Sequence, residues 1–173
     1  MTTVSQLVIR IAHIEDLPIL VDIYNQAISS TRITADITKV SVEDRVDWFK
    51  DHLPNQHPIF VAENDDQIIG WCSLSAYRPG RAALRYTAEI SYYISNAYKR
   101  KGVATELIEY AIQCCPELQL KNLFAIVLES NNASIQLLEK LGFEKWGYLP
   151  RVADFDQEEI GHYYYGKRVW NGK

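Results

Sequence analysis

One short stretch, residues 88–104, combines a carboxylate, a run of basic residues and a glycine (AEISYYISNAYKRKGVA). Side chains alternate between the two faces of a strand, so the strand expected over residues 88–95 has two unlike faces. The first face carries Ala88, Ile90, Tyr92 and Ile94, and the second carries Glu89, Ser91, Tyr93 and Ser95. A partly desolvated carboxylate such as Glu89 has a raised pKa and can act as a general base, for example on an ammonium group before acyl transfer. The alternative is a structural glutamate that pairs with Arg85 or another arginine.

The basic loop of residues 99–104 leads directly into an amphipathic helix expected over residues 103–114. Gly102 has no Cβ, so an anion can approach the backbone closely at this point. The unpaired N–H groups at the start of the helix, its dipole and the three basic side chains of the loop all favour a phosphate or pyrophosphate. Neither a P-loop nor a dinucleotide-binding glycine pattern is present. The alternative is a solvated basic turn.

Two further segments carry polar groups that could bind a ligand. Asn131 follows a short apolar run and precedes a helix, where its amide can bond a peptide-like group; an Asx turn or a helix cap is the alternative use. The loop of residues 78–85 has three arginines. Arg78 and Arg85 lie close to Glu89 in the chain, and each could be an ordinary surface residue.

The elements that position these groups follow from the hydrophobic pattern. Strands are expected over residues 7–11, 59–63, 68–77, 88–95, 123–128, 143–149 and 162–169. Two helices are expected to begin after caps at Asp16 and Ser41, and two more to cover residues 103–114 and 132–141, with Gly142 as a left-handed stop. Residues 29–40 have no clear period and are expected to form a loop. The order β-α-α-β-β-β-α-β-α-β-β predicts an α/β (α+β) fold, a mixed central sheet with helices on both faces.

Composition narrows the function further. With 47% hydrophobic residues, residues 1–173 are expected to form a single domain. The net charge of −4 argues against nucleic acid as a partner. The three cysteines are expected to be buried thiols, and the four histidines show no metal-ligand spacing, so no metal is expected. No signal peptide is visible and no apolar run is long enough to span a bilayer, so a cytoplasmic protein without a membrane partner is expected.

Together these motifs resemble the GNAT superfamily of N-acetyltransferases. The loop of residues 99–104 fits the signature Q/R-x-x-G-x-G/A except that Lys99 replaces Gln/Arg, and residues 131–143 fit N-x-x-S/A followed by L-x-E-K-x-G-F. The resemblance implies the GNAT fold and acetyl-coenzyme A (acetyl-CoA) as co-substrate, with its pyrophosphate on the loop amides and its pantetheine arm beside Asn131. The cofactor-binding residues that it implies are Ser91, Tyr92, Tyr93, Ile94, Lys99, Arg100, Lys101, Gly102, Val103, Ala104, Asn131 and Ser134.

Motifs outside the segments of residues 99–104 and 131–143 narrow the resemblance to the phosphinothricin and methionine sulfone/sulfoximine N-acetyltransferase branch. These motifs are Ile23-Tyr24-Asn25, Thr34-Ala35-Asp36, Glu43-Asp44-Arg45 with Trp48-Phe49, Tyr77-Arg78-Pro79 and the tail from Gly147. The resemblance covers nearly the whole chain. It implies direct acetyl transfer to the α-amine of a small amino-acid analogue, Glu89 as the catalytic base, and a homodimer. The substrate-binding residues that it implies are Tyr77, Arg78, Arg85, Ala88, Glu89 and Ile90. The aromatic-rich tail around Tyr163 is compatible with a dimer interface, but its side chains could equally fill the core.

One position departs from the family pattern. Many members have tyrosine, and close relatives histidine, where this chain has Leu138, and that residue is usually assigned to protonate the departing thiolate. Either another group serves, with Tyr93 as the nearest candidate, or the thiolate takes its proton from water or the product ammonium. Two alternative functions stay open: a protein N-terminal or lysine acetyltransferase, and a non-catalytic acetyl-CoA-binding regulatory module. Glu89 argues against the non-catalytic module, because a pure binding module needs no carboxylate beside the thioester.

Overall fold

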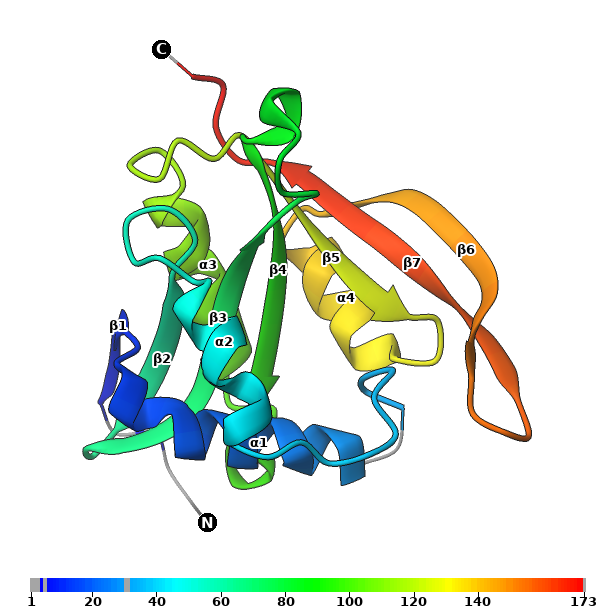
Figure 1. Ribbon diagram of the computed structural model, residues 1–173, viewed down its shortest axis with the longest axis horizontal. Coiled ribbons are helices and arrows are strands. Elements are labelled where there is room, and N and C mark those ends of the chain that lie inside the picture. The colour runs from blue at the N-terminus through cyan, green and yellow to red at the C-terminus, as the bar shows by residue number, and fades with distance from the viewer. Residues whose placement is uncertain (1–3, 5, 30–31, 173) are drawn as a thin grey trace.

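The computed structural model describes residue 4 and residues 6–29 and 32–172. Within these residues seven strands form one sheet in the order β1-β2-β3-β4-β5-β7-β6 (Figure 1). Strands β4 and β5 run parallel, and every other neighbouring pair is antiparallel. The strands are β1 (Leu7–Ile11), β2 (Ile59–Asn64), β3 (Gln67–Ala76), β4 (Thr87–Ile94), β5 (Asn122–Leu128), β6 (Glu144–Asp154) and β7 (Glu159–Arg168).

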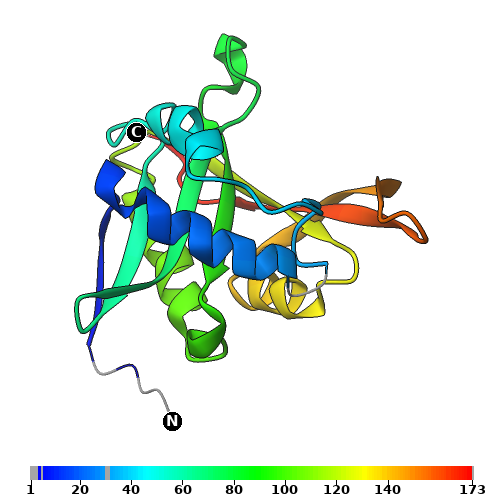
Figure 2. The same cartoon turned by 60° about the horizontal axis from the view of Figure 1, so that its bottom comes forward.

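Helices cover both faces of this sheet. On one face lie α1 (Leu17–Ser29) and α2 (Val46–Lys50), and on the other lie α3 (Val103–Cys114) and α4 (Asn132–Lys140) (Figure 2). This arrangement confirms the predicted mixed sheet with helices on both faces. Short 3₁₀ turns cover Ile14–Asp16, Glu43–Arg45, Ala82–Leu84 and Asn96–Tyr98. In the part of the chain that the structure describes, no helix combines the length and apolar character needed to cross a bilayer.

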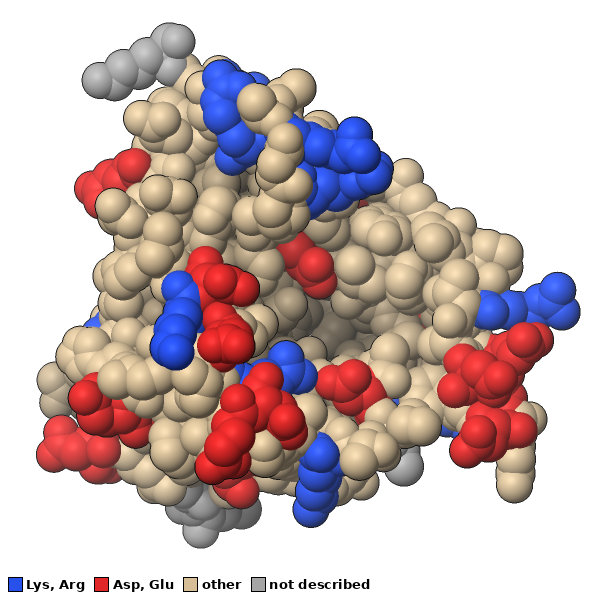
Figure 3. Space-filling model, in the orientation of Figure 1, with Lys and Arg blue, Asp and Glu red and all other residues tan. Residues whose placement is uncertain are grey.

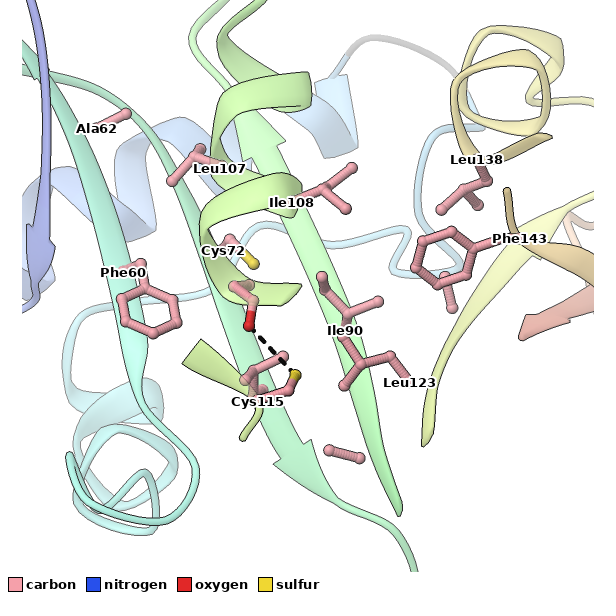
Figure 4. Packing of buried hydrophobic residues seen from close by; sticks show 14 of the residues in the cluster. Phe60, Ala62, Cys72, Ile90, Leu107, Ile108, Cys115, Leu123, Leu138 and Phe143 are labelled. Atoms are coloured by element: carbon pink, nitrogen blue, oxygen red, sulfur yellow. Dashed lines mark hydrogen bonds between the residues drawn. The ribbon is translucent and has the colours of Figure 1, made fainter. Parts of the chain in front are cut away.

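Packing of α3 against the sheet builds the larger part of the core (Figure 4). The stripe predicted for this helix is buried, namely Val103, Leu107, Ile108 and Ala111. Cys72 and Cys115 are free and buried in the same cluster, as predicted, and Cys115 Sγ donates a hydrogen bond to the carbonyl oxygen of Ala111 at 3.2 Å. Cys114 is only half-buried, so the prediction is wrong for this thiol, which lies at the end of the helix.

The two parallel strands pair over only part of their length. Residues Thr87–Glu89 of β4 pair with Asn122–Phe124 of β5, and beyond this point the strands part. The whole of β5 continues to pair with β7, so β5 follows β7 away from β4. A small cavity of about 50 Å³, which we call the wedge cavity, lies where β4 and β5 separate. The second half of β4 therefore has an open edge in the middle of the sheet (Figure 1).

Four predicted elements differ from those observed, and one of them is β7, which begins at Glu159 and not at residue 162. Asp16 does not cap α1: its carboxylate accepts a hydrogen bond from the backbone N–H of His13 (2.8 Å) and pairs with Arg10 of β1 (2.7 Å), so it closes the turn before the helix. The capping box at Ser41 forms with Asp44 as predicted, but it starts a 3₁₀ turn and then only five residues of α2. Strand β6 continues to Asp154, well beyond its predicted end, because it pairs with β7 across two irregularities. In the predicted loop of residues 29–40, Ser29 ends α1, residues 32–40 form no helix or strand, and residues 30–31 lie outside the described residues.

Candidate active site

The polar face of β4 borders a cavity of about 240 Å³ on the side of α1 and α2. Three residues of β3 share this face with three residues of β4, because paired residues of neighbouring strands point the same way. The pairs are Ser75–Glu89, Ser73–Ser91 and Trp71–Tyr93. We call this space the acid cavity. It is a hollow that two strands and two helices enclose, with a carboxylate in its wall.

Glu89 is half-buried, and burial raises the pKa of its carboxyl group. Within the described residues no arginine forms an ion pair with it. The Arg85 guanidinium instead donates to the carbonyl oxygen of Ala82 (2.7 Å) and to the hydroxyl of Tyr86 (2.8 Å). The structure therefore does not support the alternative of a structural Glu89–Arg85 pair. A carboxylate with a raised pKa, open to a cavity, has the chemistry of a general base.

Aromatic rings form most of the remaining wall. Tyr93 packs edge-on against Tyr24 with ring centroids 4.8 Å apart, and Trp71 lies 4.8 Å from Tyr93 and 5.6 Å from Trp48. The indole N–H of Trp71 donates to the carbonyl oxygen of Leu20 at 3.0 Å, which holds the ring in place. Aromatic faces beside a carboxylate attract a cation such as an alkylammonium group.

Arg45 is a lining residue of the acid cavity to which we assigned no role from the sequence. Its guanidinium lies 4.7 Å from the Tyr24 ring centroid and pairs with Asp36 at 3.3 Å. The motif Glu43-Asp44-Arg45 and the segment Thr34-Ala35-Asp36 were both visible in the sequence as parts of the family pattern. Only the packing of α2 over β3 shows that they meet at the cavity.

A second cavity of about 320 Å³ lies at the start of α3, and we call it the loop cavity. Gly102 has a φ of +85°, in the left-handed region, and a Cβ built there would meet nothing within 4 Å. It caps α3, whose first N–H groups have no partner within the helix. Lys99 and Arg100 line the cavity, and burial lowers the pKa of Lys99. Lys101 lies elsewhere: its Nζ donates to the carbonyl oxygen of Ala97 at 2.8 Å.

Asn131 caps α4. Its Oδ1 accepts a hydrogen bond from the backbone N–H of Ser134 at 3.2 Å, which confirms the helix-cap alternative. Asn131 and Ser134 both line the loop cavity and the wedge cavity. The cap does not exclude a ligand contact, because the amide also has an N–H₂ group that can donate.

Tyr92 lies on the opposite face of β4 from Glu89 and lines both the loop cavity and the wedge cavity. Its hydroxyl group is buried beside Ser134, which acts to lower the pKa of Tyr92, but it forms no hydrogen bond of standard geometry with the residues that the structure describes. Burial raises the pKa of Tyr92 to about 12. The hydroxyl is therefore protonated at neutral pH and has its hydrogen available for a ligand.

Leu138 is fully buried in the core and belongs to the same cluster as Phe143 and Ile108 (Figure 4). An apolar side chain at this point can pack but cannot donate a proton. Tyr93, the nearest candidate for that role in the sequence, lies on the Glu89 face of β4, and burial raises its pKa as well.

The predicted substrate residues do not all line the same cavity. Tyr77, Arg78 and Arg85 line a further cavity of about 400 Å³, which we call the arginine cavity. Basic side chains gather over the 78–85 loop at the upper edge of the hollow on this face of the molecule (Figure 3). The side chains of Ala88 and Ile90 point to the core instead, because they occupy the other face of β4. Only their backbone atoms can face the acid cavity, although Ile90 also lines the wedge cavity.

Comparison with known protein families identifies the fold. A family model for an acetyltransferase (GNAT) domain matches residues 6–144. The chain belongs to the GNAT family of acetyltransferases. YwnH of Bacillus subtilis, named only provisionally as a phosphinothricin acetyltransferase, is 38% identical over 149 residues, which cover 86% of this chain and 90% of YwnH. The L-methionine sulfoximine/L-methionine sulfone acetyltransferase of Pseudomonas aeruginosa is 32% identical over 145 residues, 83% of this chain and 84% of that protein.

A solved structure agrees with this membership. The GNAT phosphinothricin acetyltransferase of Sinorhizobium meliloti, solved in complex with acetyl-CoA, superposes with a TM-score of 0.88 over 96% of this chain and 90% of that one. At 24% sequence identity the likeness supports the fold. In this GNAT acetyltransferase the residues expected to bind the cofactor do come together at the loop, wedge and acid cavities, except Lys101. No group of three or more His, Cys, Asp or Glu side chains in the described ranges could hold a metal ion.

Proposed function

We propose that the protein transfers the acetyl group of acetyl-CoA to the α-amine of a small amino-acid analogue of the phosphinothricin, methionine sulfone or methionine sulfoximine type. The observation that carries this proposal is Glu89, a carboxylate with a raised pKa and no arginine partner in the described structure, in an aromatic cavity of about 240 Å³. A space of this size suits a small amine better than a peptide segment. The relatives named for methionine sulfoximine and phosphinothricin support the same substrate class.

Acetyl-CoA is proposed to bind along the other side of β4. The amides at Gly102 and the start of α3 would hold the pyrophosphate, with Lys99 and Arg100 beside it. The pantetheine arm contains two amides, and the open edge of β4 at the wedge cavity offers backbone groups that β5 leaves unpaired. Tyr93 lines the loop, wedge and acid cavities. The thioester would therefore lie near its ring, where the proposed acetyl-CoA site meets the proposed amine site.

The proposed reaction is one direct transfer. Glu89 removes a proton from the substrate ammonium group, directly or through a water molecule, which frees the lone pair of the amine. The amine then forms a C–N bond with the thioester carbonyl carbon, and the C–S bond breaks with its electron pair on sulfur. Tyr92 is proposed to donate a hydrogen bond to the developing thiolate, because its protonated hydroxyl lies at the wedge. The thiolate finally takes a proton from water or the product.

Recognition of the substrate carboxylate is assigned to arginine. We propose that Tyr77, Arg78 and Arg85, which line the arginine cavity, are substrate-binding residues. Arg45 is added as the arginine that lines the acid cavity itself. Guanidinium groups bind carboxylates through paired hydrogen bonds, so either set could orient the α-amine toward Glu89. Replacing Arg45 or Arg85 by methionine would show which of them raises the KM for an amino acid but not for the corresponding amine without a carboxylate.

A homodimer is part of the proposal. Strand β6 is an edge strand, and the hairpin that it forms with β7 projects from the body of the molecule (Figures 1 and 2). Large apolar side chains of β6 are exposed, namely Trp146, Tyr148, Leu149 and Val152. Such a row on an unpaired edge is a surface that a second copy of the chain can cover. The cytoplasmic location expected from the sequence stays a prediction.

A substrate panel tests the function. Thiol release from acetyl-CoA would be followed with methionine sulfone, methionine sulfoximine, phosphinothricin, ordinary amino acids and peptides. We expect turnover with the small amino-acid analogues. Turnover with peptides alone would contradict the substrate class. No turnover with any amine, together with protection against unfolding by coenzyme A, would indicate a binding module instead.

A further inference from the structure

His52 connects the end of α2 to β3 through two hydrogen bonds. Its Nδ1 lies 2.6 Å from the carbonyl oxygen of Trp48, and its Nε2 lies 2.9 Å from the hydroxyl oxygen of Ser75. Ser75 lies opposite Glu89 in the strand register and lines the acid cavity. A buried imidazole therefore contacts the wall of the proposed active site from behind.

The partners of His52 fix where the hydrogens lie. A carbonyl oxygen only accepts, so Nδ1 carries the ring hydrogen and donates it to Trp48. Burial lowers the pKa of His52, which keeps the ring neutral near pH 7 and makes Nε2 an acceptor. Ser75 must then donate its hydroxyl hydrogen to Nε2. Its oxygen turns only lone pairs toward the acid cavity, so Ser75 is an acceptor there.

The neighbouring charged groups leave this assignment intact. Asp51, beside His52 in the chain, favours the charged imidazole, but its effect on the pKa is smaller than that of burial. His57 is the other titratable ring nearby, and burial lowers its pKa too. On the sheet side the nearest ionisable group in the register is Glu89, which faces the cavity.

We propose that Ser75, oriented by His52, is a second acceptor for the amino group of the substrate beside Glu89. This inference rests on the proposed function. An ammonium group between the two residues donates one hydrogen to Glu89 and another to the Ser75 oxygen. When Glu89 takes its proton, the hydrogen bond to Ser75 stops the amine from turning, so the freed lone pair keeps one direction. Ser75 binds substrate, and His52 is a positioning residue that acts through it.

Single substitutions separate this role from simple anchoring of α2. Ser75→Ala is expected to lower kcat/KM for the amine about 10-fold to 100-fold, the effect of one hydrogen bond to a charged group, with the KM for acetyl-CoA unchanged. Ser75→Thr keeps the hydroxyl and is expected to restore most of the activity. His52→Asn keeps a donor for the Trp48 carbonyl but loses the acceptor that orients Ser75, so it should lower kcat/KM in the same direction as Ser75→Ala but by less, because the serine oxygen is still present. The double variant should be no worse than Ser75→Ala alone, because His52 acts only through Ser75.

Ser41→Ala is the matched control. This substitution removes the capping box that starts the segment leading to α2, and Ser41 does not line the acid cavity. It should therefore lower the melting temperature without changing the KM for the amine. If Ser75→Ala and His52→Asn also lower only the melting temperature, the inference is wrong and the hydrogen bonds are structural. If the wild-type protein acetylates no amine at all, the proposed function itself has failed.

Discussion

The φ of Gly102 provides a test of the cofactor site in which stability and binding can be separated. Gly102 and Gly80 both have a φ of +85°, and a Cβ at either position would meet no atom within 4 Å. Alanine at each should therefore cause the same backbone strain and no clash. One glycine starts α3 at the loop cavity, and the other lies in the 78–85 loop at the arginine cavity.

The magnitude follows from the conformation. A residue with a Cβ in the left-handed region costs about 1–2 kcal/mol relative to glycine. Since no contact adds to this strain, both Gly102→Ala and Gly80→Ala should lose about 1–2 kcal/mol of unfolding free energy, a fall of about 2–8 °C in melting temperature for a chain of this size. Only Gly102→Ala also changes the cofactor site, because its Cβ would occupy space through which the pyrophosphate approaches the loop amides. Losing one or two bonds to a charged group weakens binding about 10-fold to 100-fold or more.

Thermal unfolding and isothermal titration with coenzyme A measure the two effects. We expect equal losses of stability in the free proteins, and weakened coenzyme binding in Gly102→Ala alone. If Gly102→Ala binds coenzyme A as tightly as Gly80→Ala and the wild type, the pyrophosphate does not lie on these amides. If the two variants lose very different amounts of stability without ligand, the equivalence of the two backbone positions is refuted.

Three further predictions concern the catalytic groups and the assembly. Glu89→Gln should lower turnover about 10²-fold with coenzyme binding nearly intact, and full activity would remove Glu89 as the base. Because burial raises the pKa of Glu89, the wild type loses stability as pH rises from below the ordinary value of 4.5 through the raised folded value. Glu89→Gln should therefore melt higher than the wild type at pH 7, and the difference should vanish below pH 4.5. Tyr92→Phe removes a hydroxyl that forms no hydrogen bond of standard geometry with the described residues, so the melting temperature should hold or rise while kcat falls about 10-fold; an unchanged kcat would contradict its contact with the leaving sulfur. Val152→Glu on β6 should dissociate the proposed dimer in sedimentation velocity, whereas Ile37→Glu, also at an exposed apolar residue, should not; a monomeric wild type would reject the interface.

The sequence predicts best what depends on local periodicity. The bounds and buried stripe of α3, and the two faces of β4, follow from spacings within one element, so they match the structure. Asp16 does not cap α1 because the backbone N–H of His13, in the preceding turn, and Arg10, on the preceding strand, both bond its carboxylate. The contact with Arg10 is tertiary, and no pattern within residues 13–20 contains it.

The acid cavity could be predicted only in part for the same reason. Glu89 and Tyr93 are visible from β4 alone, but Arg45 comes from the 3₁₀ turn before α2, and His52, which contacts the cavity wall through Ser75, follows the end of α2. Ser75 faces Glu89 only through the register of β3 against β4. Nearness in the chain does not fix which cavity a side chain lines: Arg85 is four residues before Glu89, yet it precedes β4 and bonds within its own turn, so its side chain lines the arginine cavity.

Side chains alternate between the two faces of β4, and this alternation offers a reason why the chain can lack a polar residue at position 138. The amine is proposed to approach from the face with α1 and α2, and the thioester from the open edge toward α3 and α4. Residues on opposite faces of a strand have an odd spacing, so a base on the amine side and a donor on the thioester side can lie three residues apart. Glu89 and Tyr92 have this spacing, whereas Tyr93 shares the face of Glu89 and reaches the wedge cavity from that side. With a hydroxyl already at the wedge from β4, α4 can place Leu138 in the core, where it adds packing.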